Sequence, residues 1–152
     1  MQTKTSPIIL ILCLTGLAGA QTDPPQVSLK VPKTAVAGHT CAAVVSVTFA
    51  AGLHGYQNPP SDDTLIPTSV SVTGGLFKLK GVQYPKGQME TLSGETKPVG
   101  VYEGAIKIPV TLVAPTKKGK STVTFKVHYQ ECNDQSCFPP DDVTITASID
   151  VR

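Results

Sequence analysis

Residues 123–151 read VTFKVHYQECNDQSCFPPDDVTITASIDV, and two stretches of alternating apolar and polar residues flank a pair of cysteines there. The apolar positions are Val123, Phe125, Val127 and Tyr129 before the cysteines, and Val143, Ile145, Ala147, Ile149 and Val151 after them. Successive side chains of a strand point to opposite faces. A period of two therefore predicts strands with one buried and one solvated face, as in an antiparallel two-layer fold.

The same alternation recurs upstream, at Ile106, Ile108, Val110 and Leu112. Further strands are expected over Val27–Val31, Cys41–Phe49, Leu65–Thr73 and Leu76–Val82, with Gly- or Pro-containing turns between them. No stretch shows an apolar stripe with helical spacing. About seven or eight short strands in one domain predict an all-β, immunoglobulin-like antiparallel β-sandwich. The chain has no Trp, so the Cys–Trp–Cys signature of antibody domains is missing.

The N-terminus has the features of a secretory signal peptide. Lys4 is followed by an apolar stretch from Pro7 to Leu17 and by the small residues Ala18-Gly19-Ala20. That apolar stretch is too short to span a bilayer, which takes about 20 residues. We expect residues 1–20 to be removed near Ala20, residues 21–26 to form a tail, and residues 27–152 to form the domain. The mature chain is then periplasmic or secreted, soluble or peripheral, and not stably inserted in a membrane.

Composition excludes little else. The formal net charge is +2, and the basic residues are scattered apart from Lys117-Lys118-Gly119-Lys120, which is typical of a solvated turn. Nothing resembles the basic face of a nucleic-acid-binding protein, so no nucleic-acid partner is expected. No G-x-S-x-G, Gly-rich phosphate loop or H-E-x-x-H motif is present, which leaves hydrolase and nucleotide chemistry without support.

The cysteine pair carries the distinctive chemistry. Cys132 and Cys137 enclose Asn133-Asp134-Gln135-Ser136, and Phe138-Pro139-Pro140 follows. Asn, Asp and Ser favour turns, and a turn brings two Cα atoms within the 4.4–6.8 Å that disulfides usually span. A bridge over so short a loop adds only about 2 kcal/mol through chain entropy. Exchange needs a thiolate and a nearby resolving thiol, which the pair supplies.

From spacing alone, a permanent disulfide is the more frequent alternative. No helix N-terminus lowers a thiol pKa here, and Asp134 disfavours a thiolate by like charge. Both interpretations remain open at this point.

The stretch YQECNDQSCFPP, residues 129–140, resembles the cysteine motif of the N-terminal periplasmic domain of DsbD, the thiol:disulfide interchange protein. In that family a cysteine pair follows Tyr-Gln and precedes an aromatic residue and Pro-Pro. Three other segments resemble the family in the same order: residues 53–59, residues 81–87 and residues 101–110. The resemblance covers roughly residues 27–151.

The resemblance implies a sandwich that passes reducing equivalents from a membrane-embedded electron donor to periplasmic thioredoxin-like proteins, and a place in cytochrome c biogenesis. By the family pattern Cys137 forms the mixed disulfide with the partner and Cys132 resolves it. The expected activity is that of a protein-disulfide reductase component that is monomeric and uses no cofactor. Full-length DsbD carries a membrane segment and a C-terminal thioredoxin domain, whereas this chain ends at Arg152. Its electron source is therefore expected to be a separate protein.

The family shields its cysteines with a loop that bears an aromatic cap. The corresponding region is Gln88–Gly100, a polar stretch expected to be a long loop, and it contains no aromatic residue. Met89 and Leu92 are the candidate substitutes. Tyr129 and Phe138 flank the cysteines and are candidates for lining a partner groove.

Two competing hypotheses remain. One is a structural or protein-binding β-sandwich with a permanent Cys132–Cys137 disulfide. The other is a metal-handling module that would combine the two cysteines with His39, His54 and His128, although no recognised ligand spacing supports it. Cys41 is expected to be a buried free cysteine that acts as a small apolar residue. The four tyrosines are expected in the core or the sheets.

Overall fold

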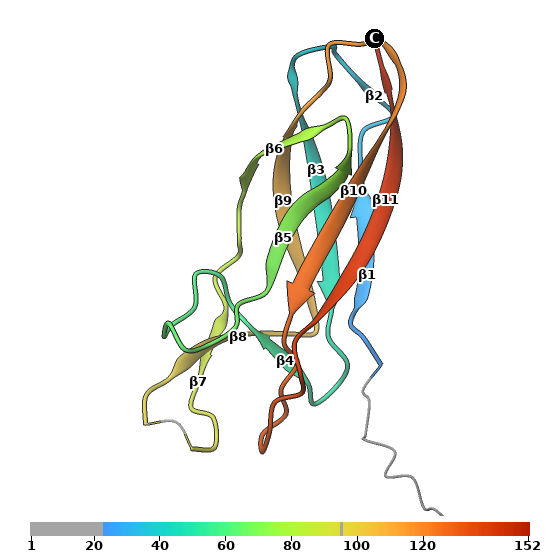
Figure 1. The fold of residues 1–152 in the computed structure, drawn as a ribbon. Coiled ribbons are helices and arrows are strands. Elements are labelled where there is room, and N and C mark those ends of the chain that lie inside the picture. The colour runs from blue at the N-terminus through green and yellow to red at the C-terminus, as the bar shows by residue number, and fades with distance from the viewer. Residues whose placement is uncertain (1–22, 95) are drawn as a thin grey trace, which may run out of the picture.

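A computed structural model describes residues 23–94 and 96–152, and these fold into strands joined by turns (Figure 1). The strands are β1 (Gln26–Lys30), β2 (Thr34–Ala35), β3 (Thr40–Thr48), β4 (His54–Tyr56), β5 (Ser69–Gly75), β6 (Lys78–Val82), β7 (Gln88–Glu90), β8 (Val99–Glu103), β9 (Ala105–Val113), β10 (Gly119–Tyr129) and β11 (Asp141–Val151). The expected signal peptide lies outside the described residues.

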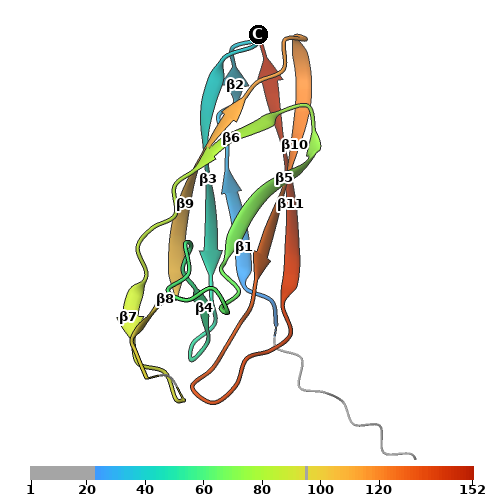
Figure 2. The same cartoon turned by 60° about the vertical axis from the view of Figure 1, so that its left-hand side comes forward.

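Two four-stranded sheets form the layers of an immunoglobulin-like sandwich. Their strand orders are β1-β3-β9-β6 and β2-β11-β10-β5, and every pairing is antiparallel except that of β2 with β11. A third sheet, with the order β4-β8-β7, extends one end of the sandwich (Figures 1 and 2). The expected fold class is confirmed.

The core lies between the two layers and follows the alternation in the sequence. On β10, Val123, Phe125 and Val127 are fully buried, while the residues between them face outward. Val45 and Val47 of β3 and Ile108 and Leu112 of β9 meet them from the other sheet. Burial of each such side chain contributes about 1.5–3 kcal/mol. This packing fixes the register of the long strands and hence the position of every loop.

The β10–β11 ladder determines where the cysteine segment lies. Its register runs from Gly119 opposite Val151 to Tyr129 opposite Asp141. Residues 130–140 therefore close this hairpin at one end of the sandwich, the end that also carries β4, β7 and β8 (Figure 1). The C-terminus of β11 lies at the opposite end.

Four short strands depart from the sequence-based expectation. These are β2, β4, β7 and β8, and the expectation of a long loop over Gln88–Gly100 was wrong in that this segment contains β7 and the start of β8. Alternation needs about four residues to be recognised, so β2, β4 and β7, with two or three residues each, cannot display it. β8 has five residues, but its first four are all buried, so it shows no alternation. The strand expected over Leu65–Thr73 begins only at Ser69, since Pro67 has no backbone N–H to donate to a ladder.

The tyrosines do lie in the core or the sheets. Tyr56, Tyr102 and Tyr129 are buried, and Tyr84 packs partly buried against the core while its hydroxyl accepts the Val70 N–H at 2.9 Å. In residues 23–94 and 96–152 no helix has the length and apolar character of a membrane span.

Candidate functional site

Cys132 is positioned by the small third sheet. Its N–H donates to the His54 carbonyl and its carbonyl accepts the His54 N–H, both at 2.9 Å, so Cys132 pairs with the first residue of β4. In such an antiparallel pair the two side chains lie on the same face. Tyr56, two residues along β4, shares that face.

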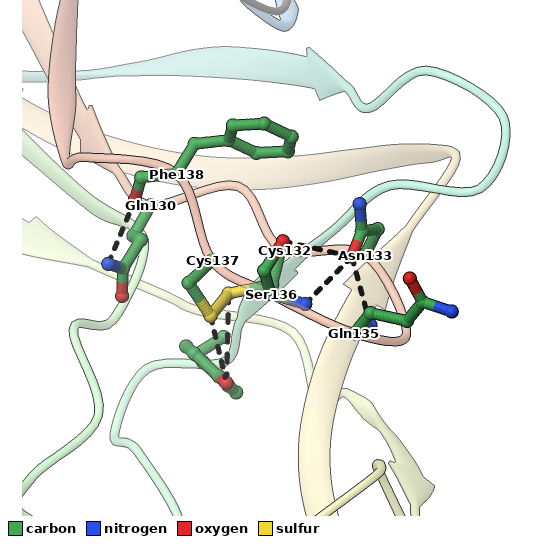
Figure 3. The surroundings of a disulfide bond; sticks show 8 residues. Gln130, Cys132, Asn133, Gln135, Ser136, Cys137 and Phe138 are labelled. Carbon is green, nitrogen blue, oxygen red and sulfur yellow. Dashed lines mark hydrogen bonds between the residues drawn. A yellow bond between two sulfur atoms is a disulfide. The ribbon is translucent and has the colours of Figure 1, made fainter. Parts of the chain in front are cut away.

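A side-chain-stabilised turn returns the chain from Cys132 to Cys137 (Figure 3). Asn133 Oδ1 accepts the N–H groups of Gln135 at 2.9 Å and Ser136 at 2.8 Å, and the Asn133 N–H donates to the Ser136 carbonyl. Below the turn, the Phe138 N–H donates to the Glu131 carbonyl at 2.8 Å. Asn is suited to this role because its short side chain reaches the backbone two residues ahead.

The turn brings the two cysteines together in a disulfide. Cys132 and Cys137 lie opposite each other with their Cα atoms 3.9 Å apart and their sulfurs bonded at 2.00 Å. Gln130 Nε2 donates to the Phe138 carbonyl at 3.0 Å across the base of this small hairpin (Figure 3). The scaffold thus holds both sulfurs at a fixed place on the end of the sandwich.

The two cysteines differ in exposure. Cys132 is 1% exposed, whereas Cys137 is exposed. Thiol–disulfide exchange begins when a thiolate attacks one sulfur of a disulfide, and access decides which sulfur it reaches. Of the two cysteines, Cys137 is the one that solvent reaches.

The Tyr56 hydroxyl lies 3.7 Å from the sulfur of Cys132 and 3.7 Å from that of Cys137. Neither sulfur of a disulfide carries a hydrogen, so the hydroxyl is the donor in both contacts. A neutral sulfur is a weak acceptor, and a thiolate formed at the same place is a strong one because it is charged. The geometry can therefore stabilise the thiolate that Cys132 becomes when the disulfide opens.

His54 lies behind Tyr56 and is 2% exposed. The two rings meet edge to face with their centroids 5.9 Å apart, and His54 Nε2 is buried with no hydrogen-bond partner. Burial lowers the pKa of His54, while the carboxylates of Glu103, Asp134 and Glu90 act in the opposite direction. Burial therefore favours the neutral imidazole, and this effect outweighs that of the three carboxylates, which favour the protonated form.

A small apolar cluster, here called the disulfide cluster, surrounds Cys132. It consists of Tyr56, Val99, Val101 and Cys132, with Leu65 and Leu92 packed partly buried against it. Leu92 comes from the connection between β7 and β8, and Leu65 comes from the connection between β4 and β5. Aliphatic side chains from two loops thus pack against the cluster that contains Cys132.

The loop that carries Leu65 is tied to β8 and to the residue before β7 by the Gln57 and Ser61 side chains. Gln57 Oε1 accepts the Gly87 N–H at 3.0 Å, and Ser61 Oγ accepts the Gly100 N–H at 2.8 Å. A Cβ at Gly100 would lie 2.2 Å from Gln57 Cδ, so any larger residue there would displace the Gln57 side chain from its hydrogen bond. These contacts hold the loop between β4 and β5 against the third sheet.

The remaining residues singled out from the sequence lie in different places. Leu92 packs against the disulfide cluster, but Met89 is 54% exposed. Phe138 is half-buried, and its ring points away from the disulfide (Figure 3). Tyr129 is buried, so the expectation that it lines an open groove does not fit its place in the structure. Burial, with Asp141, Glu131 and Asp142 adding to it, raises the pKa of Tyr129 to about 12.

The other thiol and the histidines are dispersed. Cys41 is a free, half-buried cysteine on β3, and burial raises the pKa of its thiol. His39 is exposed, and His128 Nδ1 lies 2.8 Å from Asp142 Oδ1 on the outer face of β10 and β11. Across the described ranges, no group of three or more His, Cys, Asp or Glu side chains is arranged to hold a metal ion.

The sequence does not indicate that Tyr56 and Leu65 are neighbours of the cysteines, and it groups His54 with them only as a candidate metal ligand. Tyr56 contacts sulfurs that lie 76 and 81 positions away in the chain. As a segment, Leu53-His54-Gly55-Tyr56 stands out only through the family resemblance. Its chemical role needed the pairing of β4 with Cys132.

Comparison with known proteins agrees with this site. The family described as thiol:disulfide interchange protein DsbD, N-terminal, matches residues 24–149. The DsbD N-terminal domain of Neisseria meningitidis, solved in the reduced form, is 17% identical, with 83% of this chain and 84% of that chain covered and a TM-score of 0.51. At this identity the likeness supports the fold alone.

A cohesin module from a Clostridium perfringens family 33 glycoside hydrolase is 12% identical, over 86% of this chain and 98% of that one, with a TM-score of 0.42 that is too low to bear on function. No curated protein matches the sequence. The family match spans nearly all of the described residues and includes both cysteines of the disulfide. The chain belongs to the family of the N-terminal domain of the thiol:disulfide interchange protein DsbD.

Proposed function

We propose that this protein is an exported thiol–disulfide interchange domain that cycles Cys132 and Cys137 between disulfide and dithiol. It passes reducing equivalents from a membrane-embedded electron donor to periplasmic thioredoxin-like proteins. The observation that supports this most is the unequal exposure of the pair, with Cys137 open to solvent and Cys132 buried in the disulfide cluster.

The cycle has two halves. In the first, a donor thiolate attacks the Cys137 sulfur, the Cys132–Cys137 bond breaks, and Cys132 leaves as a thiolate beside the Tyr56 hydroxyl. The donor's second thiol then attacks the mixed disulfide and leaves both cysteines reduced. In the second, the Cys137 thiolate attacks the disulfide of an oxidised thioredoxin-like protein, and Cys132 resolves the mixed disulfide. Two electrons and two protons pass from donor to acceptor.

Export is part of the proposal. Residues 1–20 act as a signal peptide cleaved near Ala20, and the domain then works in the periplasm, where disulfides form and persist. The proposal also includes a role in cytochrome c biogenesis, because the resemblance to the DsbD family implies that role.

Trapping of a mixed disulfide tests the roles of the two cysteines. The acceptor is a thioredoxin-like protein whose second active-site cysteine is Ser and whose first is activated with thionitrobenzoate. Cys41→Ser is present throughout, so that only the pair contributes a thiol. The Cys132→Ser variant is expected to release thionitrobenzoate and keep a stable complex, because Cys137 is accessible and nothing resolves the bond. The Cys137→Ser variant is expected to react far more slowly, since Cys132 is buried. Equal trapping by both variants would refute these roles.

A further inference from the structure

Three connections meet at the end of the sandwich opposite the disulfide. They join β2 to β3, β5 to β6 and β9 to β10 (Figures 1 and 2). Backbone hydrogen bonds hold them together: the Gly38 N–H donates to the Pro115 carbonyl at 3.1 Å, and the Ala114 N–H donates to the His39 carbonyl at 2.9 Å. The Leu76 N–H donates to the Thr122 carbonyl at 3.2 Å. This end is therefore one ordered surface.

Apolar side chains project from this surface. Val36 is 60% exposed and Leu76 is 57% exposed, and they are the two most exposed of the large apolar side chains in the described residues. Beside Leu76 is an open hollow of about 460 Å³, lined by Gly38, Leu76, Lys78, Val113, Ala114, Pro115, Thr116 and Lys117. An apolar projection next to a hollow marks a surface suited to an apolar or amphipathic partner.

Lysines lie at the same end: Lys78 and Lys117 line the hollow, and Lys118 and Lys120 follow where the chain enters β10. Lys78, Lys117, Lys118 and Lys120 are all exposed. We call Val36, Leu76 and these four lysines the apolar–basic tip. Asp150 lies opposite Lys120 in the β10–β11 ladder, and its carboxylate already accepts Arg152 Nε at 3.1 Å. The positive charge of the tip therefore exceeds the negative charge of Asp150, which already pairs with Arg152.

The opposite end of the molecule is acidic. Glu90, Glu103, Asp134 and Asp141 lie in or beside the loops near the disulfide, where they outnumber Lys86 and Lys97 on either side of β7. The small formal net charge of +2 thus hides a separation of charge along the length of the sandwich. Such a molecule orients in the field of a charged surface.

We propose that the apolar–basic tip binds the anionic surface of a phospholipid membrane. Lysine side chains pair with lipid phosphates, and each lysine close to such a surface raises the partition coefficient about fivefold. Val36 and Leu76 enter the interfacial region, as apolar side chains of peripheral proteins do. A second copy of this chain docked tip to tip is a poor occupant, since it would bring two basic tips together.

The proposal has a consequence for the disulfide, although it does not rest on the exchange function. β10 spans the sandwich with 11 residues. At about 3.3 Å per residue, its length is about 35 Å. The acidic end is repelled by the same lipids, so the bound molecule holds its disulfide in water about that far from the bilayer. A donor in that membrane would reach it only with a domain that projects.

Co-sedimentation of the full domain with vesicles tests the proposal. The probes are vesicles of phosphatidylcholine alone and of phosphatidylcholine mixed with phosphatidylglycerol. We expect binding to the mixed vesicles only, and its loss when the ionic strength rises from about 0.05 M to about 0.5 M, because salt screens exposed charges. Absence of binding to mixed vesicles at low salt would overturn the proposal.

A matched pair of variants separates the tip from net charge. K117Q/K118Q/K120Q is expected to lower the partition coefficient about a hundredfold. K86Q/K97Q/K107Q removes the same charge from exposed positions away from the tip, and is expected to leave binding nearly unchanged. An equal loss from both triple variants would mean attraction by net charge alone and would contradict a site at the tip.

A second pair tests the apolar part. Leu76→Ser is expected to weaken vesicle binding several-fold with all lysines in place, while Met89→Ser, an equally exposed apolar residue at the acidic end, is expected to have no effect. Concentration-dependent dimerisation that Leu76→Ser abolishes in the absence of lipid would instead identify the tip as a contact between copies. That result would refute the membrane proposal.

Discussion

Replacement of Tyr56 by Phe removes one hydroxyl from the disulfide and leaves the ring in place. In the disulfide state the loss is small, because the hydroxyl donates to two neutral sulfurs at 3.7 Å. When Cys137 is attacked, Cys132 departs as a thiolate in a site that is 1% exposed. There the hydroxyl becomes a donor to a buried charge, and water cannot easily replace it.

The magnitude follows from this difference. A hydrogen bond to a charged group contributes about 1.5–3 kcal/mol. If most of it develops as Cys132 leaves, Tyr56→Phe slows reduction of the disulfide by about 10- to 100-fold. In the reduced protein the same loss is expected to raise the pKa of the Cys132 thiol, because the thiolate loses a hydrogen-bond donor.

The assay is stopped-flow reduction of the oxidised domain by dithiothreitol, together with titration of the reduced thiols by their reaction with iodoacetamide across pH. Tyr102→Phe is the matched control, since it deletes a hydroxyl that donates to the Pro85 carbonyl at 2.7 Å, in a hydrogen bond unrelated to the sulfurs. We expect it to lower the free energy of unfolding while leaving the reduction rate unchanged. An unchanged rate in Tyr56→Phe, or equal slowing in both variants, would refute the role given to the Tyr56 hydroxyl.

Three further predictions follow from the same site. Leu92→Ala uncovers the disulfide cluster and is expected to speed reduction of the disulfide by small thiols several-fold. The exposed Met89 is the control, and Met89→Ala is expected to leave the rate unchanged. Equal rates for the two variants in stopped-flow assays would contradict the packing of Leu92. Burial lowers the pKa of His54 in the folded protein below its unfolded value of about 6.5. Between these two pKa values the unfolded chain binds more protons than the folded one. The free energy of unfolding is therefore expected to fall as the pH drops from about 6.5 towards the folded pKa. Urea unfolding should show a flatter pH dependence in His54→Gln, and an identical slope would refute this assignment. Gly100→Ala places a Cβ against Gln57 and is expected to cost about 1–3 kcal/mol by overpacking, with part of the loss recovered in a Gln57→Ala background; additive losses in thermal unfolding would argue against the contact.

Much of the sandwich could be predicted from alternation alone. The strands β3, β9, β10 and β11 each have at least nine residues, enough to display a period of two, and the sequence locates them within a few residues of their ends. The third sheet was not predictable in this way. Its strands have three to five residues, and what makes them strands is their pairing with one another and with Cys132.

The candidate site likewise has one part that the sequence predicts and one part that it does not. The turn between the cysteines depends on Asn133 and Ser136, which are local, and the sequence indicates it. The unequal exposure of the cysteines depends on β4 and on Leu65 and Leu92, which come from distant parts of the chain and leave no local pattern.

Tyr129 is a residue whose burial the sequence predicts. It continues the buried alternation of Val123, Phe125 and Val127 on β10, and this alone places it inside the sandwich. Its proximity to Cys132 in sequence also suggested a place in a partner groove, and its burial does not support that second role. The exposure of Met89 could not be predicted in this way. Its strand, β7, has only three residues, which is too few to show a period of two.

The reduction potential of the Cys132–Cys137 pair tests the central claim most directly. It is measured by equilibrating the mature domain in glutathione or dithiothreitol buffers, with Cys41→Ser present so that no other thiol interferes. An exchange site is predicted to lie in the range of exchange proteins, about −120 to −270 mV. A potential well below about −300 mV would mark a permanent structural disulfide and contradict the proposed function.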